Sequence, residues 1–333
     1  MPAGFTHMTL SRKALDEINS EIGEDAKLLL KEHLGTFLMG SLGPDIPYMS
    51  NFDDLNPFTD EKLNEVADGL HQHHTIAIPL AGLELAKTRV KEGKILEAEA
   101  LFSFYMGYIS HIIGDGFTHP FVRDRVGDYS PTTKVAHRTL EMKLDVLVLD
   151  KYLNLEVNGV APQRDLTTFD NCEFKSEIFE SYSKFLKDFH NKNVTASKLN
   201  DLSEGMRRAL GAAEGRYPKW YTLNLGAKGI SYMDLDDIKR EEQEIRKLKR
   251  AIDADEKGIL HNSLSLSDVD VFDDIFPKYF GYMPKIIEAA YLYVFEDGPH
   301  YADLLPEINL DTGRLLTSTT LKDTPRFWEL SNV

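Results

Sequence analysis

The segment Ala100-Leu-Phe-Ser-Phe-Tyr-Met-Gly-Tyr-Ile109 leads through Ser110 into His111-Ile-Ile-Gly-Asp115-Gly-Phe-Thr-His119. Its apolar residues predict a buried helix, in which residues four apart lie on the same face. His111, Asp115 and His119 would then form one stripe of imidazole, carboxylate and imidazole. Ionisable groups are rarely buried unless they are paired or bind a metal. The segment therefore predicts a metal site inside a helical protein.

A second stripe follows in His137-Arg-Thr-Leu-Glu141. Nitrogen and carboxylate ligands on facing helices are how helical proteins build metal sites. The alternative is that His111 and Asp115 form a buried hydrogen-bonded pair while His137 and Glu141 pair on an exposed helix face. Asp145 extends the second stripe, and we interpret it as a hydrogen-bond partner rather than a ligand.

Helical periodicity dominates the whole chain, so the predicted fold class is all-α, and no strand pattern is convincing. Residues 35–60, 120–131 and 161–170 are expected to be loops, and the tail from Gly298 should pack irregularly along the surface. Residues 1–155 are expected to form a metal-binding helical core. Residues 156–333 would form a helical C-terminal extension of unknown role, either as a second unit or packed within the same domain. The expected helices are 10–34, 61–92, 95–119, 133–153, 175–190, 196–213, 235–254 and 269–294.

Composition excludes several classes of protein. The net charge of -16 argues against general nucleic-acid binding, because phosphate contacts need clustered Lys and Arg. The sequence has no apolar run of about 18 residues that could cross a membrane, and its start lacks the pattern of a secretory signal. The single cysteine, Cys172, cannot form an internal disulfide and is expected to be a structural or surface thiol. A reducing, cytoplasmic location is the resulting prediction.

Three further motifs precede the main segment: Gly4-Phe-Thr-His7, Gly40-Ser-Leu-Gly-Pro-Asp45-Ile-Pro-Tyr48 and His71-Gln-His73-His74. Asp45 lies between two prolines, which fix φ and lower the entropy lost on ordering the segment. Tyr48 is a candidate for the pocket wall. Eight of the eleven histidines precede residue 142, so the chemistry is expected in the first half. The remaining three histidines lack the spacing of metal ligands: His190, His261 and His300. The aromatic residues of the main segment are expected to lie in the core: Phe102, Phe104, Tyr105 and Phe117.

In this order, the motifs resemble those of the zinc-dependent phospholipase C family, which is related to P1-type zinc nucleases and to the catalytic part of glycosylphosphatidylinositol phospholipase D. The resemblance covers residues 3–150, and residues 160–333 are not recognised. It implies an all-helical core that holds up to three zinc ions, binds a phosphodiester and activates water. The implied partner is a small-molecule or lipid phosphate ester.

The resemblance also implies which residues bind zinc. One zinc would take Asp45, a histidine of the 71–74 cluster, His111 and Asp115. Asp115 would bridge to a second zinc, which also takes His7, and a third would take His119, His137 and Glu141. Within the cluster we favour His74, because it leads directly into the next helix, over His71. Asp45 is the candidate catalytic residue, since a carboxylate beside the reacting water could orient it or accept its proton.

The sequence departs from the family in the four-residue spacing of Asp115 and His119, which matches the phospholipase D relatives, and in lacking an export signal. Bacterial toxins of the family use the N-terminal amine as a ligand, so Met1, or Pro2 after methionine removal, is a further candidate. The alternatives are a nuclease or nucleotide phosphatase on the same scaffold, a di-iron redox protein, or an interaction protein with structural metals. The usual pair of Glu-x-x-His motifs of di-iron proteins is missing.

Overall fold

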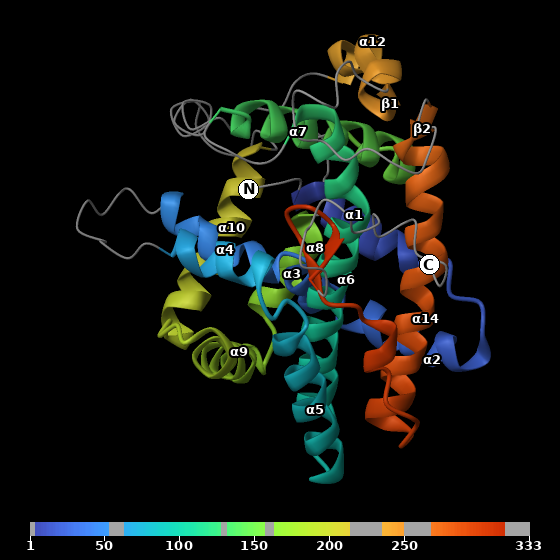
Figure 1. Cartoon of the computed structure of the whole chain (residues 1–333). Coiled ribbons are helices and arrows are strands. Elements are labelled where there is room, and N and C mark those ends of the chain that lie inside the picture. The colour runs from blue at the N-terminus through green and yellow to red at the C-terminus, as the bar shows by residue number, and fades with distance from the viewer. Residues whose placement is uncertain are drawn as a thin grey trace.

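The computed structural model describes residues 4–52, 63–127, 132–156, 163–213, 235–249 and 268–316. Within these ranges the protein is all-α, which confirms the predicted fold class (Figure 1). None of the described helices has the length and apolarity needed to cross a membrane. The helices are α1 (Gly4–Asp16), α2 (Glu21–Glu32), α3 (Leu34–Gly40), η1 (Gly43–Phe52), α4 (Asn64–Gln72), α5 (Ala77–Lys91), α6 (Ile95–Val126), α7 (Lys134–Leu153), α8 (Gln163–Asp170), α9 (Lys175–His190), α10 (Ala196–Ala213), α12 (Leu235–Arg246), η2 (Val271–Ile275), α14 (Phe276–Phe295) and η3 (Ala302–Leu304).

The helix α6 is the centre of the fold. It is 32 residues long, and its side chains are buried all round from Ala100 to Asp124, as expected of a helix in the middle of a large core. In Figure 1, α5 lies along its lower half and α7 crosses near its upper end. α1, α3, α9 and α14 also pack against it. The metal-site stripe therefore lies at the centre of the helix assembly.

α6 does not end where the sequence predicted. Pro120 was expected to begin a loop, but the helix continues to Val126 with the proline inside it. An interior proline costs about 3 kcal/mol because it removes a backbone hydrogen bond and crowds the preceding turn. Burial of neighbours such as Phe117, Phe121 and Val122 offsets that cost. Packing thus overrides the local propensity.

Two glycines bring α3 unusually close to α6. A Cβ atom at Gly40 would lie 2.0 Å from the carbonyl oxygen of Phe104, and one at Gly107 would lie 2.0 Å from the carbonyl oxygen of Phe37. Any side chain at either position would push the helices apart. This close approach brings the end of α3 against the middle of α6, where His111 lies.

Two other segments expected to be loops are partly helical. Residues 35–60 contain most of α3 and all of η1, and residues 161–170 contain α8. The structure also has two short antiparallel ladders that were not expected. They pair β1 (Lys247–Lys249) with β2 (Asp268–Asp270), and β3 (Ile308–Asn309) with β4 (Arg314–Leu315). Strands of two or three residues are too short to give a readable alternation of apolar and polar side chains.

The second half of the chain joins the core of the first half. Phe104 of α6, Phe179 of α9 and Met283 of α14 belong to the same cluster of buried apolar residues. This cluster extends across the expected division at residue 155. Residues of both halves therefore share one apolar core.

Candidate metal centre

Eight buried ionisable residues gather in two adjoining groups. The five-residue group consists of His7, Asp45, His71, His111 and Asp115, and the three-residue group consists of His119, His137 and Glu141. Within each of three sets, the potential ligand atoms all lie within 4.8 Å of one another: His7, His111 and Asp115; Asp45, His71 and His111; His119, His137 and Glu141.

Asp115 is the centre of the five-residue group. Its Oδ1 lies 3.1 Å from Nε2 of His7, and its Oδ2 lies 3.1 Å from Nε2 of His111. Asp45 Oδ1 lies 3.3 Å from Nε2 of His71. The rings of His7 and His111 stack with centroids 4.0 Å apart. Four helices, α1, η1, α4 and α6, contribute these side chains.

In the three-residue group, one oxygen of Glu141 serves both histidines. Its Oε1 lies 3.1 Å from Nε2 of His119 and 2.9 Å from Nε2 of His137. Nε2 of His119 is also 3.5 Å from Oδ1 of Asp115, so the two groups adjoin along α6. α7 contributes the other two residues, four positions apart on one face.

Backbone carbonyls fix the tautomers of three histidines. Nδ1 of His71 donates to the carbonyl oxygen of Ala67 at 2.8 Å, and Nδ1 of His111 donates to that of Ser41 at 2.9 Å. Nδ1 of His119 donates to the carbonyl oxygen of Leu310. Because a carbonyl can only accept, each Nδ1 carries a proton, and in the neutral ring the Nε2 lone pair is free to bind a metal.

Several atoms of the five-residue group face one another at ion-pair distance, yet form no hydrogen bond among the described residues. They are both carboxylate oxygens of Asp45 and of Asp115, and Nε2 of His71 and His111. An unsatisfied buried polar atom costs about 1–3 kcal/mol, and more when charged. Zinc binds imidazole nitrogen and carboxylate oxygen at about 2.0–2.2 Å. The donor set and its unsatisfied atoms therefore fit zinc.

In the metal centre, the carboxylates and the imidazoles shift one another's pKa values in the direction opposite to the effect of burial. Burial alone would raise the pKa of Asp115, but His119, His111 and His7 hold it well below its usual value. Burial would lower the pKa of His119, but Asp115 and Glu141 raise it to about 10.

The same balance holds at the other side of the centre. Burial would lower the pKa of His71, but Asp45 raises it to about 9. Burial, and then the charge of His7, lower the pKa of His111. In the metal-free protein the carboxylates are thus ionised at neutral pH. The protonated rings of His71 and His119 then supply positive charge that a metal ion could supply instead.

A chain of hydroxyl groups holds α1 against α6. Ser11 donates to the carbonyl oxygen of His7 at 2.7 Å, its oxygen lies 2.5 Å from that of Ser110, and Ser110 lies 2.7 Å from the hydroxyl of Tyr279 on α14. Asp145 accepts a hydrogen bond of 2.6 Å from the backbone N–H of Thr6. Asp145 is therefore a hydrogen-bond partner of the residue that precedes His7 in the chain.

Asp45 sits in the first turn of η1, where its backbone N–H donates to Leu42. Tyr182 of α9 donates to the carbonyl oxygen of Gly43 at 3.0 Å and so braces the start of this helix. Tyr48 is half-buried at the edge of the group, with its ring centroid 5.6 Å from that of His71 and its hydroxyl bonded to Asp68.

Of the 71–74 cluster, the structure brings His71 into the five-residue group and not His74, which the sequence analysis favoured. His71 lies in the last turn of α4 and is 2% exposed, whereas the side chain of His74 is 67% exposed. His74 follows the end of α4 and has a φ of 50°, a left-handed turn that directs it outward. It lies near Glu307 and His190 instead.

The other candidates fall outside the groups. Phe102, Phe104, Tyr105 and Phe117 are fully buried core residues. His300 lies beside Glu84 and Tyr293, and Cys172 is half-buried. His261 and the N-terminal residues Met1 and Pro2 lie outside the described residues.

The tail after Gly298 does not simply follow the surface. The backbone of Leu310 accepts from His119 Nδ1 and donates to the carbonyl oxygen of His71 at 2.7 Å. Figure 1 shows this red segment crossing in front of α6. The turn-forming residues Asp311-Thr-Gly313 are a sequence signal for a hairpin, but nothing in the sequence indicates where that hairpin docks.

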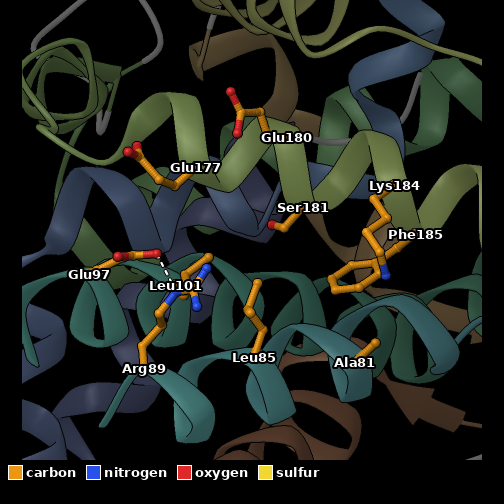
Figure 2. Close-up of a pocket in the computed structure, with 10 residues that line it drawn as sticks. All are labelled: Ala81, Leu85, Arg89, Glu97, Leu101, Glu177, Glu180, Ser181, Lys184 and Phe185. Carbon is orange, nitrogen blue, oxygen red and sulfur yellow. Dashed lines mark hydrogen bonds and ion pairs between the residues drawn. The ribbon is translucent and has the colours of Figure 1, made fainter. Parts of the chain in front are cut away.

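A separate pocket of about 310 Å³ lies between α5, α6 and α9. Figure 2 shows Glu97 paired with Arg89 on one side and Phe185 on the other. Leu101 lines it from α6, about 15 Å along the helix from His111. It contains no member of either group, so the metal centre and this pocket are distinct.

Comparison with known families gives a match over residues 6–210, to the family described as zinc dependent phospholipase C. Neither the curated proteins nor the solved structures gave a match. The matched segment spans more than half of the chain and contains every residue of both groups. It also extends past the expected limit of residue 150 to include α9 and nearly all of α10. The chain belongs to the zinc-dependent phospholipase C family.

Proposed function

We propose that this protein is a zinc-dependent hydrolase that cleaves the phosphodiester of a phospholipid on the glycerol side, as a phospholipase C does. The observation that carries the proposal is the set of unsatisfied, mutually facing atoms of Asp45, Asp115, His71 and His111 in a buried site. A built cation site of this kind costs folding stability unless an ion fills it. Membership of the family supports zinc as that ion and a lipid phosphate ester as the substrate.

The proposed ligands form three sets. Asp45, His71, His111 and Asp115 would hold one zinc, Asp115 and His7 a second, and His119, His137 and Glu141 a third. Together, bound zinc ions would neutralise the phosphate and lower the pKa of a bound water towards neutrality.

The protein's own residues would supply orientation and a proton acceptor. Burial would raise the pKa of Asp45, but His111 and His71 beside it keep that pKa below its usual value. Asp45 is therefore ionised at neutral pH, the state needed to orient a water or to accept its proton. The carbonyls that hold the Nδ1 protons keep each Nε2 aimed into the centre.

The test is hydrolysis by the pure, zinc-loaded protein of phosphatidylcholine vesicles, single-stranded DNA and nucleotides. Release of phosphocholine and diacylglycerol, abolished by a chelator and restored by zinc, is the expected result. Turnover of DNA or nucleotides alone would replace the lipase by a nuclease or phosphatase. No turnover of any substrate by protein that carries zinc would favour a metal-stabilised interaction protein.

A further inference from the structure

The C-terminal hairpin, residues 308–315, contacts both groups of the metal centre although it lies far outside the matched segment. Through its backbone, Leu310 donates to the carbonyl oxygen of His71 and accepts from Nδ1 of His119. Ile308 and Leu310 are fully buried. A single residue of the tail thus bonds to one member of each group.

Polar contacts on both sides of Leu310 hold the hairpin in place. The hydroxyl of Thr75 donates to the carbonyl oxygen of Ile308 at 2.9 Å, and Gln72 donates to Asp311 at 2.9 Å. Both partners lie within four residues of His71 in the chain. The hairpin is therefore attached to the end of α4 as well as to α6.

Gly313 allows the turn to press against α6. It has a φ of 60°, and a Cβ atom there would lie 2.2 Å from Cγ of Pro120 and 2.7 Å from the carbonyl oxygen of Gly116. A side chain at this position would both strain the backbone and collide with the helix. The docked position of the hairpin depends on this glycine.

We propose that the C-terminal hairpin is a positioning element of the metal centre, in which Leu310 holds His119 in the tautomer and orientation that present its Nε2 to a zinc ion. The inference rests on the proposed zinc site. Partners of this kind raise the basicity of a histidine ligand and fix its ring, and their loss typically weakens metal binding 10- to 100-fold. By reciprocity, zinc stabilises the docked hairpin as much as the docked hairpin stabilises zinc binding.

The first experiment compares Gly313→Ala with Gly93→Ala in the full chain. Gly93 also has a positive φ, of 75°, but a Cβ atom there meets nothing within 4 Å. It therefore controls for backbone strain alone. Titration against a competing chelator should show about 10- to 100-fold weaker binding of one zinc in Gly313→Ala, and wild-type binding in Gly93→Ala. Equal zinc binding by Gly313→Ala and wild type would overturn the inference.

The second experiment measures the hairpin without using activity. Zinc should slow hydrogen exchange of the amides in residues 308–313 of the wild type, including that of Leu310. Exchange unaffected by saturating zinc would overturn the inference. Wild-type protein that binds no zinc would instead overturn the proposed function, on which the inference depends.

A milder pair of variants serves if Gly313→Ala fails to fold. Thr75→Val removes the hydroxyl that bonds Ile308, whereas Thr75→Ser keeps it. Weaker zinc binding in Thr75→Val that Thr75→Ser restores supports the positioning role. Equal binding by both variants contradicts it.

Discussion

The five-residue group and the three-residue group use the same kinds of side chain but differ in how their carboxylates are satisfied. Oε1 of Glu141 forms a hydrogen bond of 3.1 Å with Nε2 of His119. The oxygens of Asp115 lie at the same 3.1 Å from Nε2 of His7 and of His111 but without hydrogen-bond geometry, and those of Asp45 likewise form no hydrogen bond among the described residues. We therefore expect the three-residue group to keep its arrangement without an ion. The five-residue group is shaped for a cation, and we expect its stability to depend on one.

The largest expected effect comes from Asp115→Asn, because Asp115 lies between His7 and His111 and adjoins His119. This variant should lose more than one zinc per chain, and hydrolysis should fall by more than about 100-fold. Elemental analysis and a rate assay check it. Asp188→Asn, at an exposed position of α9, is the control. Full zinc content in Asp115→Asn would contradict the central role.

The next effect separates two neighbouring histidines. His71→Gln should lose one zinc and about 100-fold in rate, since it removes a proposed zinc ligand of the five-residue group. His74→Gln should leave both unchanged, because its side chain is 67% exposed and bonds no member of either group. The reverse outcome, measured by elemental analysis of the two variants, would show that His74 is the ligand.

Glu141→Gln tests whether the groups act separately. It should remove only the zinc of the three-residue group and lower the rate about 10- to 100-fold, while the remaining zinc stays bound. Loss of all zinc from this variant would mean that the two groups form one cooperative cluster.

Zinc binding should release protons from the histidines whose pKa values are raised. At pH 7.5 the metal-free protein carries protons on His71, pKa about 9, and on His119, pKa about 10, but the lowered pKa of His111 leaves it neutral. Zinc displaces the proton at each protonated site, so affinity there should fall about tenfold per pH unit on acidification. Calorimetry in buffers of different ionisation enthalpy measures this release, and zinc binding without it would contradict the two raised pKa values.

The same shifts set the stability of the metal-free protein. Because both pKa values are raised above the unfolded value near 6.5, their stabilising contribution is complete below about pH 6.5. It is lost as pH rises through about 9 and 10. Denaturant unfolding of chelator-treated protein between pH 6 and 10 should show this decline, and zinc-loaded protein should not follow it.

The smallest effect is expected from Tyr279→Phe. Removing its hydroxyl leaves Ser110 bonded to Ser11, so unfolding should become easier by only about 1 kcal/mol. Zinc content should stay at the wild-type level. Urea unfolding with zinc analysis checks both points, and loss of zinc would show that α14 fixes the position of His7 more tightly than its hydroxyl chain suggests.

The sequence predicted the helical class and both stripes of potential ligands, because residues four apart in sequence lie on the same face of a helix. It favoured His74 over His71, whereas the structure places His71 in the five-residue group. That choice depends on α4 ending at Gln72 and on the outward turn after it, and helix ends are weakly encoded. The contact between Leu310 and His119 joins residues far apart in the chain, so no local pattern contains it.

The rigidity of α6 has a consequence for substrate choice. His111, Asp115 and His119 stand on successive turns of one buried helix, whose pitch of about 5.4 Å is fixed by its backbone hydrogen bonds. The spacing of the charges that would meet a phosphate in the proposed reaction is thus nearly invariant under substitution elsewhere. New specificity would have to evolve at residues outside this helix, such as Tyr48 beside His71, which can change without altering that spacing.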